Sequence, residues 1–247
     1  MKNKKTNTLP FNVMQFDEKM FQNASPSQVL PIMMALDLSG SMNAAVGNSG
    51  KTCFELLCEA LHRMINTIAD DPMLKHCVEL GIITFSTDVK IVRPFSTLEE
   101  NSSLPTMCAS GLTRIGEAIV TAAHQIRAHK HDLVKKGNSN VVQPVLIVLS
   151  DGIECESDPA ALTQAAKDCQ SGDFNVVPIF IGEDNGAPGF LSELEEPINV
   201  NQLALGDLFE GIVAATTSSI TTAAEKSFRE LLASALSWTE TLGKNGK

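Results

Sequence analysis

The chain lacks any uninterrupted apolar run long enough to cross a bilayer, so we expect no membrane-spanning helix. Its N-terminus begins with several lysines, as a signal peptide does, but no continuous apolar stretch follows them, and we expect no leader. Basic residues are few: 19 lysines and arginines stand against 29 aspartates and glutamates, a formal net charge of −10. This charge disfavours binding to nucleic acids or anionic membranes through a general electrostatic field.

Paired cysteine motifs are also missing. The six cysteines form no CxxC pair and no compact framework of the kind found in disulfide-rich secreted domains. Several lie inside apolar runs, where a free thiol behaves as a small hydrophobic group. We therefore expect reduced, structural cysteines and a cytoplasmic protein; the residues are Cys53, Cys58, Cys77, Cys108, Cys155 and Cys169.

The 247 residues contain short apolar strands that alternate with helical stretches. This order is typical of an α/β, doubly wound fold with a mostly parallel central sheet covered on both faces. The residues between 85 and 89 are too few for a parallel crossover, so the third strand is predicted to be an antiparallel edge. The predicted sheet order is 3-2-1-4-5, with a weak sixth strand. Strands are expected at 31–37, 78–85, 89–92, 145–150, 176–181 and 198–200, and helices at 52–70, 115–136, 159–170 and from 205.

Three parts of the chain are distinguished by their composition. Residues 1–26 form a polar N-terminal arm, 27–222 a single domain, and 223–247 an amphipathic helix and tail. The apolar stripe of this helix favours packing against the domain over docking to a partner, although both interpretations stay open. The stripe consists of Phe228, Leu231, Leu232, Ala235, Trp238 and Leu242.

Polar side chains follow the ends of two predicted strands. Asp37, Ser39 and Ser41 end the first strand, and Asp151 ends the fourth. With the second and third strands on one side, the fourth must lie on the other side of the first, which makes this crevice the topological switch point where such folds bind ligands. Thr113 lies in the crossover before a helix and is expected to reach the same place.

These side chains offer only oxygen atoms as ligands. Carboxylates and hydroxyls suit Mg²⁺, Mn²⁺ or Ca²⁺ and do not suit metals that prefer thiolates. Two carboxylates and three neutral hydroxyls leave a divalent cation incompletely compensated. We therefore expect the cation to accept an acidic oxygen from a partner protein as its last ligand. A transferring phosphate is the alternative ligand, but no evident general base or nucleophile accompanies it.

The same three segments resemble the metal-ion-dependent adhesion site (MIDAS) of von Willebrand factor A (vWA) domains. They are Asp37-x-Ser39-x-Ser41, Thr113-x-x-Gly116 and Ser150-Asp151-Gly152, and the order of elements over residues 28–222 fits as well. The resemblance implies a Rossmann-like vWA fold in which Ser39 and Ser41 bind the metal directly. It also implies that Asp151 binds directly or through water. One departure is Leu112, where members of the family usually have a second glycine; a bulkier residue there is expected to shift the Thr113 loop.

Within that family the chain is most similar to bacterial tellurium-resistance proteins of the TerY type. The similarity lies in residues 30–37, 81–86, 110–118 and 149–152. Such proteins are cytoplasmic and are often encoded beside Ser/Thr kinases and PP2C-type phosphatases. The resemblance therefore implies a binding protein, and not an enzyme, in a stress or phosphorylation system.

Three other interpretations are weighed against this one. The segment 45–52 fits a relaxed Walker A pattern. An ATP-binding or phosphate-handling enzyme that uses Gly50-Lys51-Thr52 is therefore the main alternative. Against it, the pattern lacks its first glycine and does not directly follow the strand. His124, His129 and His131 are more typical of a solvated helix end than of a metal site. A degenerate, metal-free structural domain is the third alternative. The acidic residues Glu154, Glu156 and Asp158 are expected to form a solvated loop with a helix cap.

Overall fold

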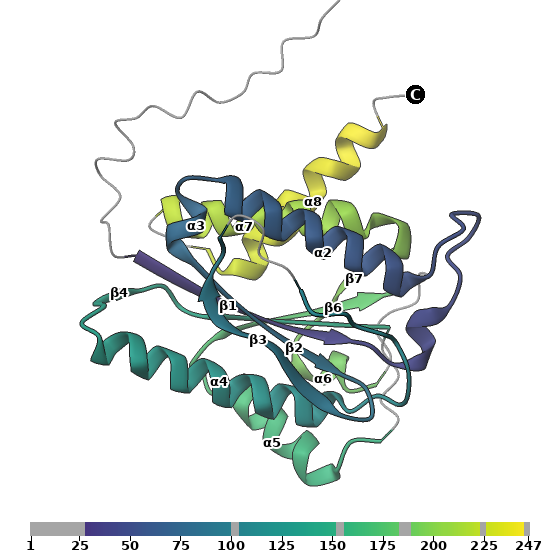
Figure 1. Cartoon of the computed structure of the whole chain (residues 1–247), viewed down its shortest axis with the longest axis horizontal. Coiled ribbons are helices and arrows are strands. Elements are labelled where there is room, and N and C mark those ends of the chain that lie inside the picture. Colours follow the sequence, from purple (N-terminus) through teal and green to yellow (C-terminus); the bar gives the residue numbers. More distant parts are fainter. Residues whose placement is uncertain (1–27, 100–103, 152–155, 183–188, 223–225, 245–247) are drawn as a thin grey trace, which may run out of the picture.

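A computed structural model describes residues 28–99, 104–151, 156–182, 189–222 and 226–244, the last seven of these by their backbone alone. The predicted N-terminal arm lies outside the described residues, and so do Glu154 and Cys155. A single mixed sheet forms the middle layer, and helices cover both of its faces (Figure 1).

The sheet has the predicted order. Its path is β3-β2-β1-β5-β6-β7, in which β3 is an antiparallel edge strand and the other pairings are parallel. The α/β doubly wound architecture is thus confirmed, with predicted strands four, five and six corresponding to β5, β6 and β7. The strands are β1 Gln28–Asp37, β2 Val78–Phe85, β3 Val89–Thr97, β4 Asn140–Val141, β5 Val145–Ser150, β6 Asn175–Ile181 and β7 Ile198–Val200.

The short strand β4 was not predicted. It pairs in parallel with the start of β1, through Gln28 with Asn140 and Val29 with Val141. This pairing explains why β1 begins three residues before the predicted start at Pro31. Two residues are too few for a periodic pattern, so only the tertiary structure reveals this extension.

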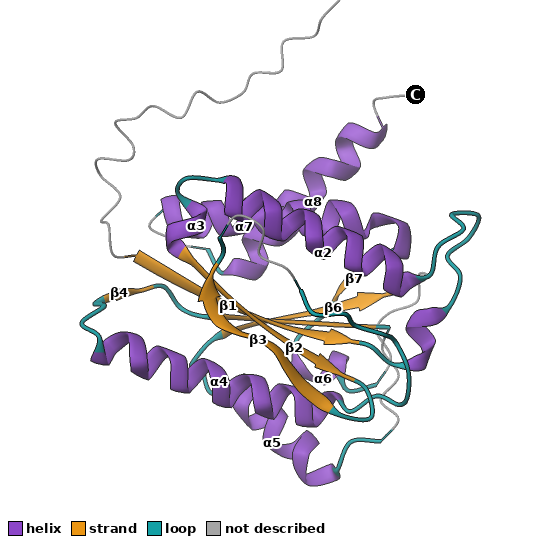
Figure 2. Cartoon of the chain, viewed as in Figure 1, coloured by secondary structure: helices purple, strands orange, loops and turns teal. Residues whose placement is uncertain are grey.

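The helices divide between the two faces of the sheet (Figure 2). One face carries α2 Cys53–Asp70, α3 Leu74–Cys77, α7 Leu205–Thr221 and α8 Phe228–Lys244. The other carries α4 Ile115–Lys135, α5 Pro159–Gln170 and α6 Leu191–Leu194. Two short 3-10 helices, η1 Gly40–Asn43 and η2 Gln202–Ala204, complete the described elements.

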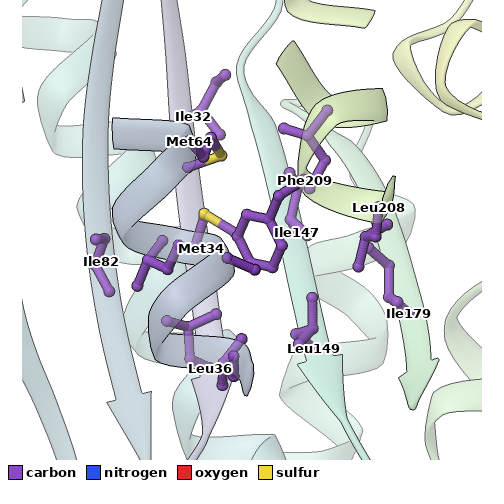
Figure 3. Packing of buried hydrophobic residues seen from close by; sticks show 14 of the residues in the cluster. Ile32, Met34, Leu36, Met64, Ile82, Ile147, Leu149, Ile179, Leu208 and Phe209 are labelled. Atoms are coloured by element: carbon purple, nitrogen blue, oxygen red, sulfur yellow. The ribbon is translucent and has the colours of Figure 1, made fainter. Parts of the chain in front are cut away.

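Burial on both faces explains the continuous apolar strands. In β1 only Gln28 is not buried, and alternate side chains enter opposite cores. Ile32, Met34 and Leu36 pack in the core below α2 and α7, which Figure 3 shows with Met64 and Phe209. Met33 and Ala35 join the core formed by α4. The strand is therefore packed on both faces up to its carboxyl end, where the predicted site begins.

Helix α7, with η2 before it, is long and apolar enough to cross a membrane by length and composition, although no such helix is expected from the sequence. Half of this segment is buried in the fold. Its residues Leu208, Phe209 and Ile212 are fully or almost fully buried in the core that covers β1. We therefore interpret its hydrophobicity as that of a core helix.

Helix α8 packs against α7. Phe228 and Leu232 are buried and belong to the same core, and Leu232 and Leu236 lie close to Gly211 of α7. The first half of the amphipathic stripe therefore contacts its own domain. The side chains of Trp238 and Leu242, which complete the predicted stripe, lie outside the described residues.

Candidate metal site

Asp37 is the centre of the site. It is the last residue of β1 and is fully buried. Its Oδ1 accepts a hydrogen bond from the Ser39 N–H at 2.7 Å, and its Oδ2 accepts one from the Ser150 hydroxyl at 2.6 Å. The Ser39 and Ser41 hydroxyls are 2.9 Å apart. The carboxylate thus joins the ends of β1 and β5, as the switch-point argument predicted.

The electrostatics of the site favour a cation. Burial raises the pKa of Asp37 to about 6, against the hydrogen bonds from Ser150 and Ser39, and the charge of Asp151 raises the pKa further. Burial, followed by the charges of Asp151 and Asp37, raises the pKa of Cys53 to about 12. Cys53 begins α2 and is almost fully buried. A fully buried carboxylate therefore lies near a half-buried one, and a bound cation would offset their repulsion.

Backbone hydrogen bonds hold the Thr113 loop against the end of β1. The Ser110 N–H donates to the Leu38 carbonyl at 2.8 Å, and the Gly40 N–H donates to the Gly111 carbonyl at 2.9 Å. Thr113 itself is buried, with 3% of its surface exposed. These bonds bring a segment more than seventy residues away in sequence to the Ser39 loop. The loop is placed by its backbone, whereas the β1 end is also held by side chains.

Leu112 does not enter the site. Its side chain is 39% exposed, and its N–H donates to the Thr87 hydroxyl at 3.2 Å. Gly111 makes the turn with φ of +84°, and a Cβ there would lie 2.3 Å from that hydroxyl. The bulk of Leu112 is therefore partly in solvent, and the expectation that it shifts the Thr113 loop stays a prediction.

Four of the five predicted residues interact in this crevice, and Thr113 is buried in the loop beside it. Hydrogen bonds link Asp37, Ser39 and Ser41 directly, while Asp151 is half-buried and acts on Asp37 through its charge. The resulting donor set contains carboxylate and hydroxyl oxygens, as hard divalent cations require. The residues present thus fit a metal of the Mg²⁺ type.

Two supporting residues were not predicted as members of the site. Ser150 was noted only as the neighbour of Asp151, yet its hydroxyl binds the buried Asp37 carboxylate. The Asn43 amide donates to the Ala109 carbonyl at 2.8 Å and so connects η1 to the segment that leads into the Thr113 loop. A serine at the end of a strand beside an expected aspartate was the available signal for the first. No comparable sequence signal indicated Asn43.

The side chains of the Walker-like segment make contacts within the protein. Lys51 Nζ forms an ion pair with Glu59 at 2.7 Å. The Thr52 hydroxyl accepts a hydrogen bond from the Glu55 N–H, and the Glu55 carboxylate accepts one from the Thr52 N–H, which is a capping box at the start of α2. The Lys51 and Thr52 side chains, which a phosphate-binding loop would use, are therefore engaged with Glu59 and Glu55.

The histidines of α4 do not converge. His129 binds Glu79 of β2 through its Nε2, and its ring stacks on Phe95 with centroids 4.3 Å apart. Within the described ranges, no group of three or more His, Cys, Asp and Glu residues is placed to hold a metal. Of the predicted acidic rim, Asp158 caps α5 by accepting from the Ala160 N–H, as expected.

Comparison with known proteins supports the same assignment. Residues 32–154 match a family model described as von Willebrand factor type A domain. No curated protein was found with a significantly similar sequence. Many solved structures share the fold at low sequence identity.

Three of these structures illustrate the similarity. Proximal thread matrix protein 1 from the mussel byssus, with a zinc-occupied MIDAS motif, is 16% identical with a TM-score of 0.54, over 76% of this chain and 48% of that one. The PilB minor pilin from Streptococcus sanguinis is 12% identical with a TM-score of 0.54, over 79% and 62%. The ArnB paralog VWA2 from Sulfolobus acidocaldarius is 15% identical with a TM-score of 0.51, over 74% and 45%.

The chain spans less than two thirds of the length of each of these structures, and at such identities the likeness concerns the fold alone. The family match covers most of β1, the Thr113 loop and the end of β5. Sequence match, sheet order and the placement of the polar residues agree. The chain therefore contains a von Willebrand factor type A domain.

Proposed function

We propose that the domain binds another protein through a divalent cation held by Asp37, Ser39, Ser41, Thr113 and Asp151. The observation that carries this proposal is the buried Asp37 carboxylate, which joins two strand ends and holds the Ser39 backbone in place. A cation at this position supplies positive charge that attracts a carboxylate of the partner. This use agrees with the metal-dependent protein interactions for which vWA domains are known.

The protein's own groups have distinct roles in this proposal. The hydroxyls of Ser39 and Ser41 are direct ligands, and Asp151 binds directly or through a water molecule. Ser150 orients the Asp37 carboxylate by donating to its Oδ2. We propose Mg²⁺ as the cation, with Mn²⁺ or Ca²⁺ as alternatives, because all the donors are oxygen atoms.

We propose a binding role over catalysis. The competing interpretation, a phosphate-handling enzyme, would use Lys51 and Thr52, which are engaged with Glu59 and Glu55. The chain's similarity to TerY-type tellurium-resistance proteins supports a cytoplasmic protein in a stress or kinase–phosphatase system. A Ser/Thr kinase or a PP2C-type phosphatase is then the proposed partner class.

An affinity capture experiment tests this proposal. The intact chain is immobilised and exposed to a lysate of its source cells with 5 mM Mg²⁺ or with EDTA, and retained proteins are identified by mass spectrometry. We expect partners that are retained with Mg²⁺ and released by EDTA. Asp37→Asn should lose them, whereas Asp70→Asn, which changes an exposed carboxylate at the far end of α2, should keep them. Retention that ignores both EDTA and Asp37→Asn would contradict the proposed function.

A further inference from the structure

Leu112 is an apolar side chain exposed beside the metal site. Among the described residues the exposed large hydrophobics are four, namely Ile91, Leu112, Val134 and Leu203. Leu112 alone of these adjoins a proposed metal ligand, since Thr113 is the next residue. Single exposed leucines are common on protein surfaces. Here the position of Leu112 beside the site and the hydrogen bonds of its loop make it a candidate contact for a bound partner.

The backbone of Leu112 is fixed on both sides. Its N–H donates to the Thr87 hydroxyl in the turn between β2 and β3. The preceding carbonyl, of Gly111, accepts from the Gly40 N–H, and the following residue, Thr113, is buried. The leucine is therefore presented by a loop held from the edge hairpin and from the β1 end. A partner that covers Leu112 would bury apolar surface without paying to order this loop.

Acidic residues lie next to the Thr113 loop. The Glu156 N–H donates to the Thr113 carbonyl at 3.3 Å, which places Glu156 beside the loop, and the residue is exposed. Asp158 follows and is exposed as well. The whole chain carries a net charge of −10. A partner that presents many carboxylates would therefore be repelled around the site, although a single carboxylate is attracted to the cation.

Resting on the proposed function, we propose that the site selects protein segments in which one carboxylate lies beside a large apolar residue and a basic residue. The carboxylate binds at the metal, the apolar side chain covers Leu112, and the basic side chain faces Glu156. Strongly acidic segments are rejected. Leu112 and Glu156 are then specificity-determining residues that do not themselves hold the metal.

A peptide selection tests this inference. A library of heptapeptides with a fixed central Asp and six random positions is selected on the immobilised protein in Mg²⁺, and bound peptides are eluted with EDTA and sequenced. The wild type should enrich Leu, Ile, Met or Phe next to the Asp, and Lys or Arg at another position. Affinities of the selected peptides are then measured by fluorescence anisotropy.

Three variants separate the contributions. Leu112→Ser should abolish the apolar enrichment and weaken a selected peptide about tenfold, the loss expected when one leucine contact is removed. Val134→Ser is the matched control, since Val134 is also exposed but lies about 28 Å along α4 from Ile115. Glu156→Gln should reduce the enrichment of Lys and Arg. Circular dichroism spectra like that of the wild type establish that each variant is folded.

The outcomes distinguish the two levels of the proposal. Metal-dependent selection of Asp peptides with no apolar or basic preference, or with a preference unchanged in Leu112→Ser and Glu156→Gln, would overturn the specificity proposal while leaving the proposed function intact. If the wild type retains no peptide in a metal-dependent way, both proposals fail. Enrichment of polyacidic peptides would also overturn the specificity proposal.

Discussion

Residues 37–41 and 45–52 are neighbouring segments rich in small polar residues, but they use their polar groups in different ways. In the first, the Asp37 carboxylate and the Ser39 and Ser41 hydroxyls turn toward one another in a mostly buried crevice. In the second, Lys51 and Thr52 pair with side chains of α2, and Ser49 binds backbone carbonyls of its own loop. The difference shows that a polar motif can form a ligand site only where its polar side chains face one shared position and are not bonded elsewhere in the protein.

The largest difference is expected for metal affinity. Asp37→Ala removes the central carboxylate and should weaken Mg²⁺ or Mn²⁺ binding more than about 100-fold, since even outer residues of metal sites change affinity by about 10- to 100-fold. Lys51→Ala, in the neighbouring segment, should leave it unchanged. Isothermal titration calorimetry of both variants checks the comparison. Equal binding by wild type and Asp37→Ala would show that the metal binds elsewhere, and ATP binding lost on Lys51→Ala would favour the enzyme interpretation.

A pH effect on stability should also be confined to the first segment. Because the pKa of Asp37 is raised from 3.8 to about 6, the metal-free folded protein holds this proton more tightly than the unfolded chain does. Its stability should therefore fall as the pH rises from about 4 to above 6, by about 3 kcal/mol for a shift of this size.

Urea unfolding in EDTA at a series of pH values measures this effect as the difference between wild type and Asp37→Asn, which cannot titrate. Saturating Mg²⁺ should remove the loss at high pH. If the free energies of unfolding of wild type and Asp37→Asn change in parallel between pH 4 and 7 in EDTA, burying the Asp37 charge does not destabilise the folded protein.

Ser150→Ala should have a smaller effect on the metal. It removes the hydrogen bond at 2.6 Å to Asp37 Oδ2 while leaving all five proposed ligands in place. We expect Mg²⁺ affinity to fall about tenfold, as for other residues that orient a metal ligand. Calorimetry measures this, with Ser49→Ala in the neighbouring loop as the control. An unchanged affinity for Ser150→Ala would mean that the Asp37 carboxylate needs no orientation by β5.

The smallest effect is expected in the second segment and on a different property. Thr52→Ala removes the capping box of α2 and should lower the free energy of unfolding by about 1 kcal/mol. Metal affinity should stay unchanged, because the Thr52 hydroxyl serves the helix. Urea unfolding and calorimetry on the same sample check both statements. A large loss of metal affinity would mean that the second segment belongs to the site after all.

Much of the fold could be predicted from the sequence because its signals are local. The segment 86–88 is too short for a crossover, which required β3 to be antiparallel and thereby determined on which side of β1 the next strand lies. That argument also predicted the meeting of Asp37 with the end of β5, where their hydrogen bond now lies. The start of α5 was predicted from Pro159, which suits a first helical turn.

The remaining features depend on contacts between distant segments. The extension of β1 arises from its pairing with β4, and the direction of the Leu112 side chain depends on the Thr87 hydroxyl, 25 residues earlier in the chain. The hydrophobic length of α7 was also missed as a candidate span, since the segment was read only as a resumed helix. For the β1 extension and for Leu112 the deciding partner lies on another element, which periodicity along one segment does not reveal, whereas the hydropathy of α7 was readable from its own sequence.

The position of Cys53 has a consequence for how the site meets toxic metals. Its thiol is almost fully buried. This burial, together with the nearby charges of Asp151 and Asp37, raises the pKa of the thiol to about 12. A soft ion such as cadmium or mercury binds a thiolate, and this sulfur keeps its proton at cellular pH. Among the described residues, this thiol is thus held in its weakly binding protonated form, which favours hard cations over soft ones in the crevice.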